Sequence, residues 1–373
     1  AFGYRDQQAK LPVTPETLFA VGSTTKAFTS LALAMAFERH GYSLDQAVRD
    51  FLPGFKLSQE DIAHQLTLED TLSHRSGLPR HDLMRVLGGF ERTELLERME
   101  YLDFNPDPDF GFRGNFQYNN LMYVVAGRVL EVITKQTWED YVANQIFAPL
   151  QMTATTATPL SSDTLANNHA APHKDGKKFD YADLQPIGPA GTINSNIVDY
   201  GKWIQFFLNN GQLSNGKQLV ERKTFDQIFE SHNSINETLD YGLGWVIVRQ
   251  EDGGLIMTHN GSVPGFYSRV IFSTGRDYGV IVFTNEAAEI STAEDIANAV
   301  FLETSELQGT EQGPLTTASF ISDNFENPSY DTLEPLANFL TYFDSSLARE
   351  ENITVEPDLL LGTYINNAYG EFT

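Results

Sequence analysis

Hydrophobic residues cover nearly every side of the segment from Thr24 to His40, which contains the longest uninterrupted apolar run of the chain, Leu31 to Phe37. Alanine, leucine and methionine favour helix, and Gly41 is suited to end a helix because glycine readily adopts the left-handed conformation. The pattern therefore predicts a buried helix that is entered at Ser23. The run is far shorter than the roughly 20 residues that a membrane-spanning helix requires, so no membrane span is predicted.

Between residues 59 and 187, apolar positions recur at the spacing of helices rather than strands. Loops rich in proline and aspartate, such as Asn105 to Asp109, separate these segments. A mostly helical region is therefore expected, with helices at Leu95 to Met99, Leu121 to Ile133 and Trp138 to Ile146.

The pattern changes between Tyr241 and Asn285 to short runs rich in β-branched and aromatic residues. Turn sequences containing glycine and aspartate separate the runs, which is typical of an antiparallel meander. We predict strands at Leu243 to Val248, Leu255 to Thr258, Gly265 to Phe272 and Tyr278 to Thr284, followed by a helix near Thr292 to Leu302.

This order of elements predicts an α+β fold in which helices flank an antiparallel sheet and a mostly helical domain is inserted. The α/β domain would be discontinuous, formed by residues 1–58 and 188–302, with the helical domain at 59–187. Residues 303–373 are strongly acidic, which favours a solvated linker that leads into a further β module. Because residue 1 is Ala rather than Met and the sequence stops in strand-like text, processing or truncation is expected at both ends.

The composition of the chain excludes several classes of function. The formal charge is −25, and so acidic a surface repels phosphate backbones, so no nucleic-acid partner is expected. The chain has no cysteine, which excludes disulfides, thiol nucleophiles and thiolate metal sites. The H-E-x-x-H, G-x-S-x-G, Walker A and G-x-G-x-x-G patterns are also missing, so no metal or cofactor is predicted. Nucleophiles must be hydroxyls, amines or carboxylates.

A serine with a lysine three residues later stands at the start of the first predicted helix, as Ser23 and Lys26. Residues i and i+3 are neighbours on a helix, so the lysine can act as the base that a serine nucleophile needs. The positive end of the helix dipole also favours a developing oxyanion. The same S-x-x-K pattern recurs at Ser214 to Lys217, within a Gly/Asn turn that indicates a surface loop.

Two further polar motifs follow in chain order. Tyr118 and Asn120 stand just before an apolar helix, where a phenol and an amide could project into a cleft. A second Y-x-N, Tyr364 to Asn366, lies in strand-like text of the acidic C-terminal region. His259 and Gly261, at the end of a predicted strand, form the only H-x-G of the chain, and the glycine would let a substrate backbone approach closely.

In this order, the S-x-x-K, Y-x-N and H-x-G motifs resemble those of the serine β-lactamase and penicillin-binding-protein superfamily. The resemblance is to its class C-like branch, which includes class C β-lactamases, D-alanyl-D-alanine carboxypeptidases, D-aminopeptidases and family VIII esterases. It runs from about Phe2 to Glu286 and is supported by four flanking segments, Leu72 to Leu78, Pro189 to Ser195, Asp199 to Trp203 and Tyr241 to Trp245. It implies a β-lactamase/transpeptidase-like fold and a metal-independent serine hydrolase that works through an acyl-enzyme.

The resemblance also implies a role for each motif residue. Ser23 would be the acylated nucleophile, and Lys26 either a base or the electrostatic partner that lowers the pKa of the phenol. Tyr118 would relay protons between the serine, the leaving group and the deacylating water. Asn120 would hydrogen-bond the acyl side of the substrate.

The third motif departs from the β-lactamase pattern, which usually carries lysine where this chain has His259. Imidazole is cationic only part of the time near neutral pH, so a permanent anchor for a substrate carboxylate is missing. The backbone N–H groups of Ser23 and Ser262 would form the oxyanion hole, with Gly261 beside them. These features favour small esters, or amides and peptides with D-amino-acid character, as substrates.

Two alternatives to that activity stay open. One is β-lactamase or D-alanyl-D-alanine carboxypeptidase activity, and the other is a catalytically silent homologue that binds peptides or acts as a scaffold. The resemblance favours a periplasmic or secreted location and leaves the oligomeric state open. Family members usually carry another strand pair before Phe2, which would complete the sheet.

Each candidate residue also has a structural interpretation. Ser23 can cap a helix while Lys26 points to solvent, Tyr118 can be a packed aromatic residue, and His259 can be a core histidine with satisfied hydrogen bonds. His74 is expected to make loop hydrogen bonds rather than to take part in catalysis.

Two weaker patterns are interpreted as structural or accidental. His169 and His173 have the i, i+4 spacing of a metal pair, but Pro172 breaks the helix that this spacing requires. Asn260 lies in an N-x-S pattern typical of glycosylation, and a glycan there would block the predicted site.

Overall fold

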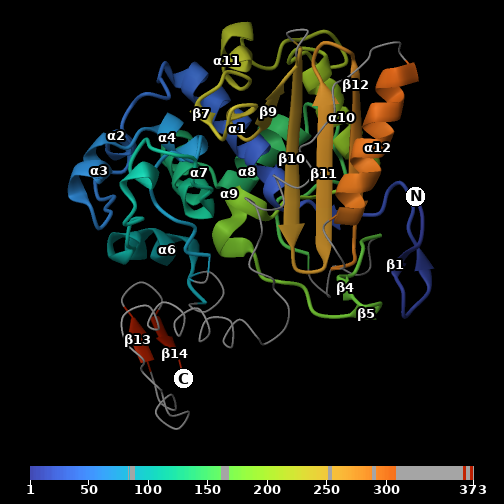
Figure 1. The fold of residues 1–373 in the computed structure, drawn as a ribbon, viewed down its shortest axis with the longest axis horizontal. Coiled ribbons are helices and arrows are strands. Elements are labelled where there is room, and N and C mark those ends of the chain that lie inside the picture. Colours follow the sequence, from blue (N-terminus) through green and yellow to red (C-terminus); the bar gives the residue numbers. More distant parts are fainter. Residues whose placement is uncertain are drawn as a thin grey trace.

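The computed structural model describes residues 1–82, 84, 89–160, 168–250, 254–287, 291–307, 364–366 and 370–372. Its central feature is an antiparallel sheet with the strand order β12-β11-β10-β9-β8-β7 (Figure 1). The strands are β7 (Asn233–Ser234), β8 (Leu239–Tyr241), β9 (Val246–Arg249), β10 (Leu255–Val263), β11 (Phe266–Ser273) and β12 (Tyr278–Thr284). Neighbours in sequence are neighbours in the sheet, which confirms the predicted meander and the α+β class.

Strand β10 is longer than predicted, and the extra length carries the third motif. The prediction ended this strand at Thr258, whereas its pairing with β11 continues from Ile256 opposite Ser273 to Val263 opposite Phe266. His259 and Gly261 therefore lie within the strand. Polar residues and a glycine hide this part of the strand from a pattern search, because strand propensity measures packing rather than backbone preference.

The two faces of the sheet are covered by different helices, as alternation of side chains along each strand requires. Helix α12 (Ser291–Leu307) contributes Ala297 and Phe301 to a cluster with alternate residues of the strands, among them Ile256 and Ile271. The opposite face, which includes Met257 and Phe272, belongs to the main core. Figure 1 shows α12 lying along the sheet, with α1 on the other side.

Helix α1 (Thr25–His40) forms the centre of the main core, and every residue from Thr25 to Phe37 is buried. A single 3-10 turn, Gly22–Thr24, precedes it. Gly41 ends it in the left-handed conformation with φ 71°, which confirms the predicted end. A helix that is apolar on all sides requires neighbours on all sides, and α1 has them.

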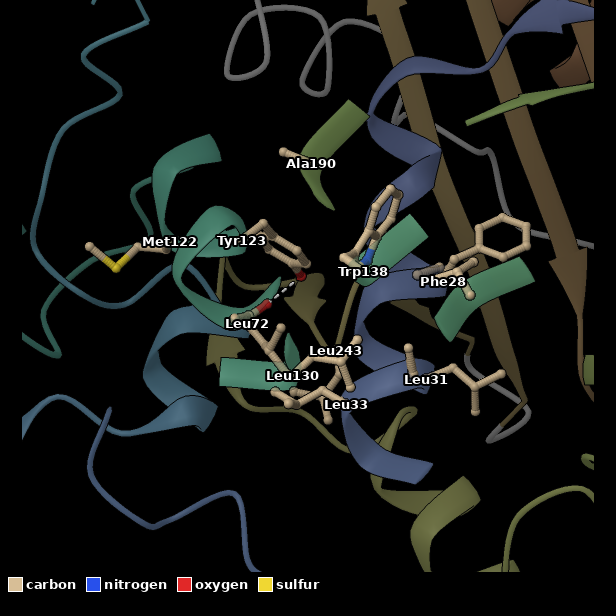
Figure 2. Close-up of a cluster of buried hydrophobic side chains, with 14 of the residues drawn as sticks. Phe28, Leu31, Leu33, Leu72, Met122, Tyr123, Leu130, Trp138, Ala190 and Leu243 are labelled. Carbon is tan, nitrogen blue, oxygen red and sulfur yellow. Dashed lines mark hydrogen bonds between the residues drawn. The ribbon is translucent and has the colours of Figure 1, made fainter. Parts of the chain in front are cut away.

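Figure 2 shows the packing around α1, with Phe28, Leu31 and Leu33 projecting from the helix. The Phe28 ring stacks on Trp203 with a centroid distance of 3.8 Å. The Tyr123 hydroxyl donates a hydrogen bond of 2.6 Å to the Leu72 carbonyl (Figure 2). This contact joins two helices of the region that was predicted to be mostly helical.

That region contains the expected helices and one short hairpin. Its helices are α3 (Glu60–Gln65), α4 (Leu68–Leu72), α6 (Arg92–Arg98), α7 (Asn120–Thr134) and α8 (Trp138–Val142), the last continued by a π-helical turn at Ala143–Phe147. The hairpin pairs β4 (His173–Lys174) with β5 (Lys177–Lys178), so His173 lies in a strand, and its Nε2 accepts from the N–H of Gln7. The division into an α/β and a helical domain stays a prediction.

The remaining elements complete the fold. The other helices are α2 (Val48–Phe51), α9 (Gly188–Gly191), α10 (Ile197–Leu208) and α11 (Arg222–Gln227). The two-stranded pairs are β1 (Tyr4–Asp6) with β2 (Leu11–Pro12), β3 (Phe19–Ala20) with β6 (Asn194–Ser195), and β13 (Tyr364–Asn366) with β14 (Gly370–Phe372). Within the described residues, no helix is long and apolar enough to cross a membrane.

Candidate active site

The 3-10 turn before α1 places Ser23 against strand β10. Gly22 has φ +53°, and a β-carbon at this position would lie 2.8 Å from the Ser262 amide nitrogen. Only glycine combines that backbone conformation with so close an approach. Ser23 itself is half-buried, whereas its neighbours Gly22 and Thr24 are buried. The turn therefore presents one hydroxyl at the surface of the core.

Lys26 is completely buried and points at that hydroxyl. Its Nζ lies 3.2 Å from Ser23 Oγ, 2.7 Å from Asn120 Oδ1 and 3.0 Å from the Ala190 carbonyl oxygen. Two of these partners can only accept hydrogen bonds. Lys26 thus donates to all three oxygens, and when it loses a proton the two carbonyl oxygens hold the remaining hydrogens and leave the lone pair for Ser23. The interpretation of Lys26 as a solvent-exposed lysine is wrong.

Helix α7 brings the second motif to the same place. Asn119 is its N-cap, with a side chain that accepts from the N–H of Met122 and donates to the carbonyl oxygens of Leu78 and Pro79. The cap fixes Tyr118 just before the helix and Asn120 in its first turn. Lys26 Nζ lies 4.7 Å from the centre of the Tyr118 ring.

His74 makes loop hydrogen bonds, as predicted, and also supports Tyr118. Its Nδ1 accepts from the N–H of Asn119 at 3.1 Å, and its carbonyl oxygen accepts from Gln117 at 3.0 Å. Its ring lies 4.3 Å from the Tyr118 ring. Burial and the positive charge of Lys26 hold the pKa of His74 well below its usual range, so the ring is neutral.

The Tyr118 phenol is protonated at neutral pH. Burial raises its pKa, and this effect outweighs the influence of the Ser23 hydroxyl and the positive charge of Arg80, which lower it. The influence of Ser23 places the phenol beside the nucleophile. A protonated phenol at this position is a proton donor rather than a base.

His259 faces Tyr118 across the site, with their ring centres 6.3 Å apart. Its Nδ1 lies 2.6 Å from the Asn260 carbonyl oxygen and must carry the proton, which leaves Nε2 to accept from the Tyr241 hydroxyl at 3.1 Å. Burial lowers the pKa of His259 to about 3, and the charge of Lys26 adds to the effect. The imidazole is therefore neutral near neutral pH, not partly cationic as the sequence suggested.

The strand segment from His259 to Val263 has an open edge on the side of the nucleophile. Strand β9 pairs with β10 only from Leu255 to Thr258, whereas β11 follows it to Val263. A β-carbon at Gly261 would overlap the Val21 carbonyl oxygen, so glycine lets the strand lie directly on the turn before Ser23. The Ser262 amide nitrogen is thereby next to the turn that carries Ser23.

A charged pair from the loop after the first helices borders the site. The Asp82 carboxylate accepts from Asn120 Nδ2 at 2.8 Å and from Arg80 Nε at 2.6 Å. The Arg80 guanidinium lies 4.9 Å from the centre of the Tyr118 ring. Neither residue was predicted.

The structure brings the three predicted motifs together from three distant parts of the chain. Sequence analysis missed three partners of these residues: Ala190, Tyr241 and Asp82. Ala190 and Tyr241 lie in segments that carried the resemblance to the family, so only their position in space was missing, whereas Asp82 lies outside those segments.

The two decoy motifs lie elsewhere in the fold. Ser214 and Lys217 are exposed in a turn that Leu213 closes by donating to the Lys217 carbonyl oxygen. Tyr364 to Asn366 form strand β13, as their sequence suggested. The interpretation of Ser214 to Lys217 as a surface loop is confirmed.

Comparison with protein families is in line with this geometry. A family model described as Beta-lactamase matches residues 1–305. Protein flp from Staphylococcus aureus (strain NCTC 8325 / PS 47) is 24% identical over 304 residues, which cover 77% of this chain and 57% of that protein. Unguisins hydrolase ungD' from Aspergillus campestris is 27% identical over 310 residues, covering 74% and 54%. The chain thus spans little more than half the length of these curated relatives.

Solved structures share the fold. The octameric penicillin-binding protein homologue from Pyrococcus abyssi superposes with a TM-score of 0.65 and 22% identity, covering 83% of this chain and 70% of that one. The D-amino acid amidase from Ochrobactrum anthropi SV3, solved with L-phenylalanine, gives a TM-score of 0.65 and 19% identity, covering 82% and 89%.

Proposed function

Because the chain belongs to the Beta-lactamase family, we propose that it is a serine hydrolase that forms an acyl-enzyme on Ser23. Its substrates are small esters, or amides and peptides with D-amino-acid character. One observation carries the proposal: the Nζ of a fully buried lysine lies 3.2 Å from a half-buried serine hydroxyl, with two carbonyl oxygens orienting it. A purely structural lysine has no reason to be held beneath an accessible hydroxyl.

In acylation, the reactive form is the one in which Lys26 has lost a proton: its Nζ accepts the Ser23 proton while Oγ forms a bond to the substrate carbonyl carbon. The negative charge that develops on the carbonyl oxygen is placed between the backbone N–H groups of Ser23 and Ser262. The bond to the leaving group then breaks, and the departing atom takes its proton from the Tyr118 hydroxyl. The resulting phenolate is stabilised by the positive charges of Lys26 and Arg80.

Deacylation runs the same proton transfers in the opposite direction. The Tyr118 phenolate removes a proton from water, and the hydroxide attacks the acyl carbon. The bond to Ser23 breaks, and its oxygen recovers the proton held by Lys26. Each group thus returns to its starting protonation state, so the cycle consumes only water.

The third motif supports the substrate class. A neutral His259, with both ring nitrogens engaged inside the protein, provides no positive charge for a terminal carboxylate of a substrate. This argues against substrates that such a charge would anchor, β-lactams among them. The name of one similar protein, a D-amino acid amidase, favours amide bonds.

Turnover of three chromogenic substrates tests the proposal. p-Nitrophenyl butyrate, D-alanine p-nitroanilide and nitrocefin should be compared for the wild type, Ser23→Ala and Ser214→Ala. We expect the ester or the anilide to be hydrolysed, and the activity to be lost in Ser23→Ala and retained in Ser214→Ala. Full activity of Ser23→Ala would reject the proposal, and hydrolysis of nitrocefin alone would assign the site to a β-lactamase instead.

Covalent labelling separates catalysis from mere binding. A fluorophosphonate should add to Ser23 and remain attached after denaturation, as peptide mass spectrometry would show. If the label is absent and ligands are released on denaturation, the chain is the silent binding homologue.

A further inference from the structure

A buried polar cluster lies behind the third motif, on the face of the sheet that α12 covers. It consists of Asn260 from β10, Tyr267 and Arg269 from β11, and Glu294 from α12. Arg269, Glu294 and Tyr267 are 1%, 2% and 5% exposed. Asn260 and Arg269 are direct partners in the β10–β11 register.

Hydrogen bonds connect the whole cluster through the Asn260 side chain. Its Oδ1 accepts from Arg269, and its Nδ2 donates to Glu294 Oε1. The same carboxylate oxygen accepts from the Tyr267 hydroxyl at 2.6 Å. The side-chain amide of Asn260 therefore bridges the buried cation, Arg269, and the buried anion, Glu294.

The same residue also acts on the front of the sheet. Side chains alternate along a strand, so His259 and Gly261 face the nucleophile while Asn260 faces α12. The Asn260 carbonyl oxygen meanwhile accepts from His259 Nδ1. The Asn260 side chain is thus held on the α12 side of the sheet, and the Asn260 carbonyl oxygen holds the His259 ring on the side of the nucleophile.

Burying charged groups is costly, and apolar residues of similar size would often serve stability equally well. A cost of this kind suggests a purpose other than stability. Holding this segment in place is such a purpose, because β9 leaves β10 at Thr258 and, among the residues that the structure describes, no strand pairs with residues 259–263 on that side. An oxyanion hole works only when its donors are held in place beforehand.

We propose that Arg269 and Glu294 are positioning residues that act through Asn260 to hold the His259–Ser262 segment of β10, and with it the Ser262 amide, against Ser23. This rests on the proposed acyl-enzyme function. None of the cluster residues touches the substrate. Their effect is on transition-state stabilisation, which needs the Ser262 N–H at a fixed position, rather than on substrate binding. The role of Asn260 as a glycan carrier is ruled out in this folded form, because its amide group is enclosed by Arg269 and Glu294.

Asn260→Ala tests this directly, because it removes the bridge and leaves both the catalytic side chains and the backbone groups of the site. Glu294→Gln is the conservative partner, since it keeps an oxygen that accepts from Tyr267 and Asn260 but removes the charge. Asp199→Asn is the matched control: Asp199 is a buried carboxylate that pairs with Lys202 and accepts from the N–H groups of Ala154 and Thr155.

Four quantities should be measured for each variant: kcat and KM on the best substrate and the affinity for a phenylboronic acid, all at one temperature, and Tm by thermal unfolding. The boronate forms a tetrahedral adduct with a serine nucleophile and so reports on the oxyanion hole. We expect Asn260→Ala to lower kcat and boronate affinity in parallel by about 10- to 100-fold, less than the full loss of one oxyanion donor, with little change in KM. Glu294→Gln should have an intermediate effect. Asp199→Asn should lower Tm and leave kcat and boronate affinity unchanged.

Two results would overturn the inference. One is a folded Asn260→Ala with wild-type kcat and boronate affinity, and the other is a control that loses as much kcat as Asn260→Ala. If Asn260→Ala does not fold, Glu294→Gln decides by the same criteria. Wild-type turnover that does not depend on Ser23 would instead reject the proposed function, so the two failures are distinguishable.

Discussion

The chain contains the pattern S-x-x-K twice, at Ser23 to Lys26 and at Ser214 to Lys217, and the two copies differ in every physical respect. In the first, the lysine is completely buried and held by Asn120 and Ala190. In the second, all four residues are exposed in a turn. The S-x-x-K pattern only makes a serine nucleophile with a lysine base possible. Whether the lysine can act as that base depends on the residues that pack around it.

The residues directly after each pattern account for the difference. Lys26 leads into a helix whose residues are buried up to Phe37, so its ammonium cannot reach solvent and must find partners inside. Lys217 precedes a short bridge between Gln212 and Gln218 and no long apolar segment. A serine becomes a nucleophile only where the base beside it is immobilised, and long apolar sequence after the lysine achieves this.

Removal of the two lysines gives the largest contrast. Lys26→Met should lower kcat by about three orders of magnitude or more, since it deletes the proposed general base and its positive charge. Lys217→Met should leave kcat unchanged. Steady-state kinetics of both variants on one substrate measures the ratio. Equal activities would mean that the two copies are equivalent and that the buried lysine is structural.

A smaller loss is expected from Tyr118→Phe, which removes only the hydroxyl of the proposed proton donor. Loss of a general acid costs about 100- to 10,000-fold, and the effect should be larger for the anilide than for the p-nitrophenyl ester. The nitrophenolate can leave without a proton, whereas an amine cannot. Because deacylation involves Tyr118 for either substrate, single-turnover measurement of the acylation rate on both substrates tests this, and an equal loss in that rate would exclude Tyr118 as the proton donor.

The glycines of the two segments provide a matched pair. Gly22→Ala should reduce turnover by about 100-fold, because its β-carbon would lie 2.8 Å from the Ser262 amide nitrogen and displace an oxyanion donor. Gly216 has φ +80° and nothing within 4 Å, so Gly216→Ala should cost about 1 kcal/mol of stability and no activity. Measuring kcat and the free energy of unfolding in urea for both variants separates the cost of backbone strain from the effect on catalytic geometry. An equal loss of kcat in both variants would refute the role of the close approach between Gly22 and Ser262.

Sequence alone predicted much of this arrangement, for identifiable reasons. The boundaries of α1 were predictable because a continuous apolar run and a final glycine mark them. The three motifs were found because each has a short, fixed spacing. The α+β class followed from the change in periodicity after Tyr241.

What sequence could not predict depends on contacts between distant segments. The continuation of β10 to Val263 is invisible in a polar, glycine-containing stretch, and it appears only when β11 supplies the pairing. The neutral state of His259 follows from burial and from the charge of Lys26, neither of which a histidine in a sequence reveals. The Asp82 and Arg80 pair likewise has no spacing that relates it to Asn120.

The last expected effect concerns stability and separates the buried site from an exposed position, His40, by the response of each to acid. Burial lowers the pKa of His259 to about 3 in the folded chain, against 6.5 as the ordinary value. Between these values the unfolded chain binds a proton that the folded chain does not, so the free energy of unfolding should fall as pH decreases from about 6.5 to 3. His259→Gln should reduce that slope by up to about 1.4 kcal/mol per pH unit, while His40→Gln, which changes an exposed residue, should leave it unaltered. Urea unfolding at pH 7, 6, 5 and 4 measures the slopes. Identical slopes for the wild type and His259→Gln would mean that the histidine is protonated in the folded chain. Substrates with a terminal carboxylate, which a neutral His259 does not anchor, would then have to be considered again.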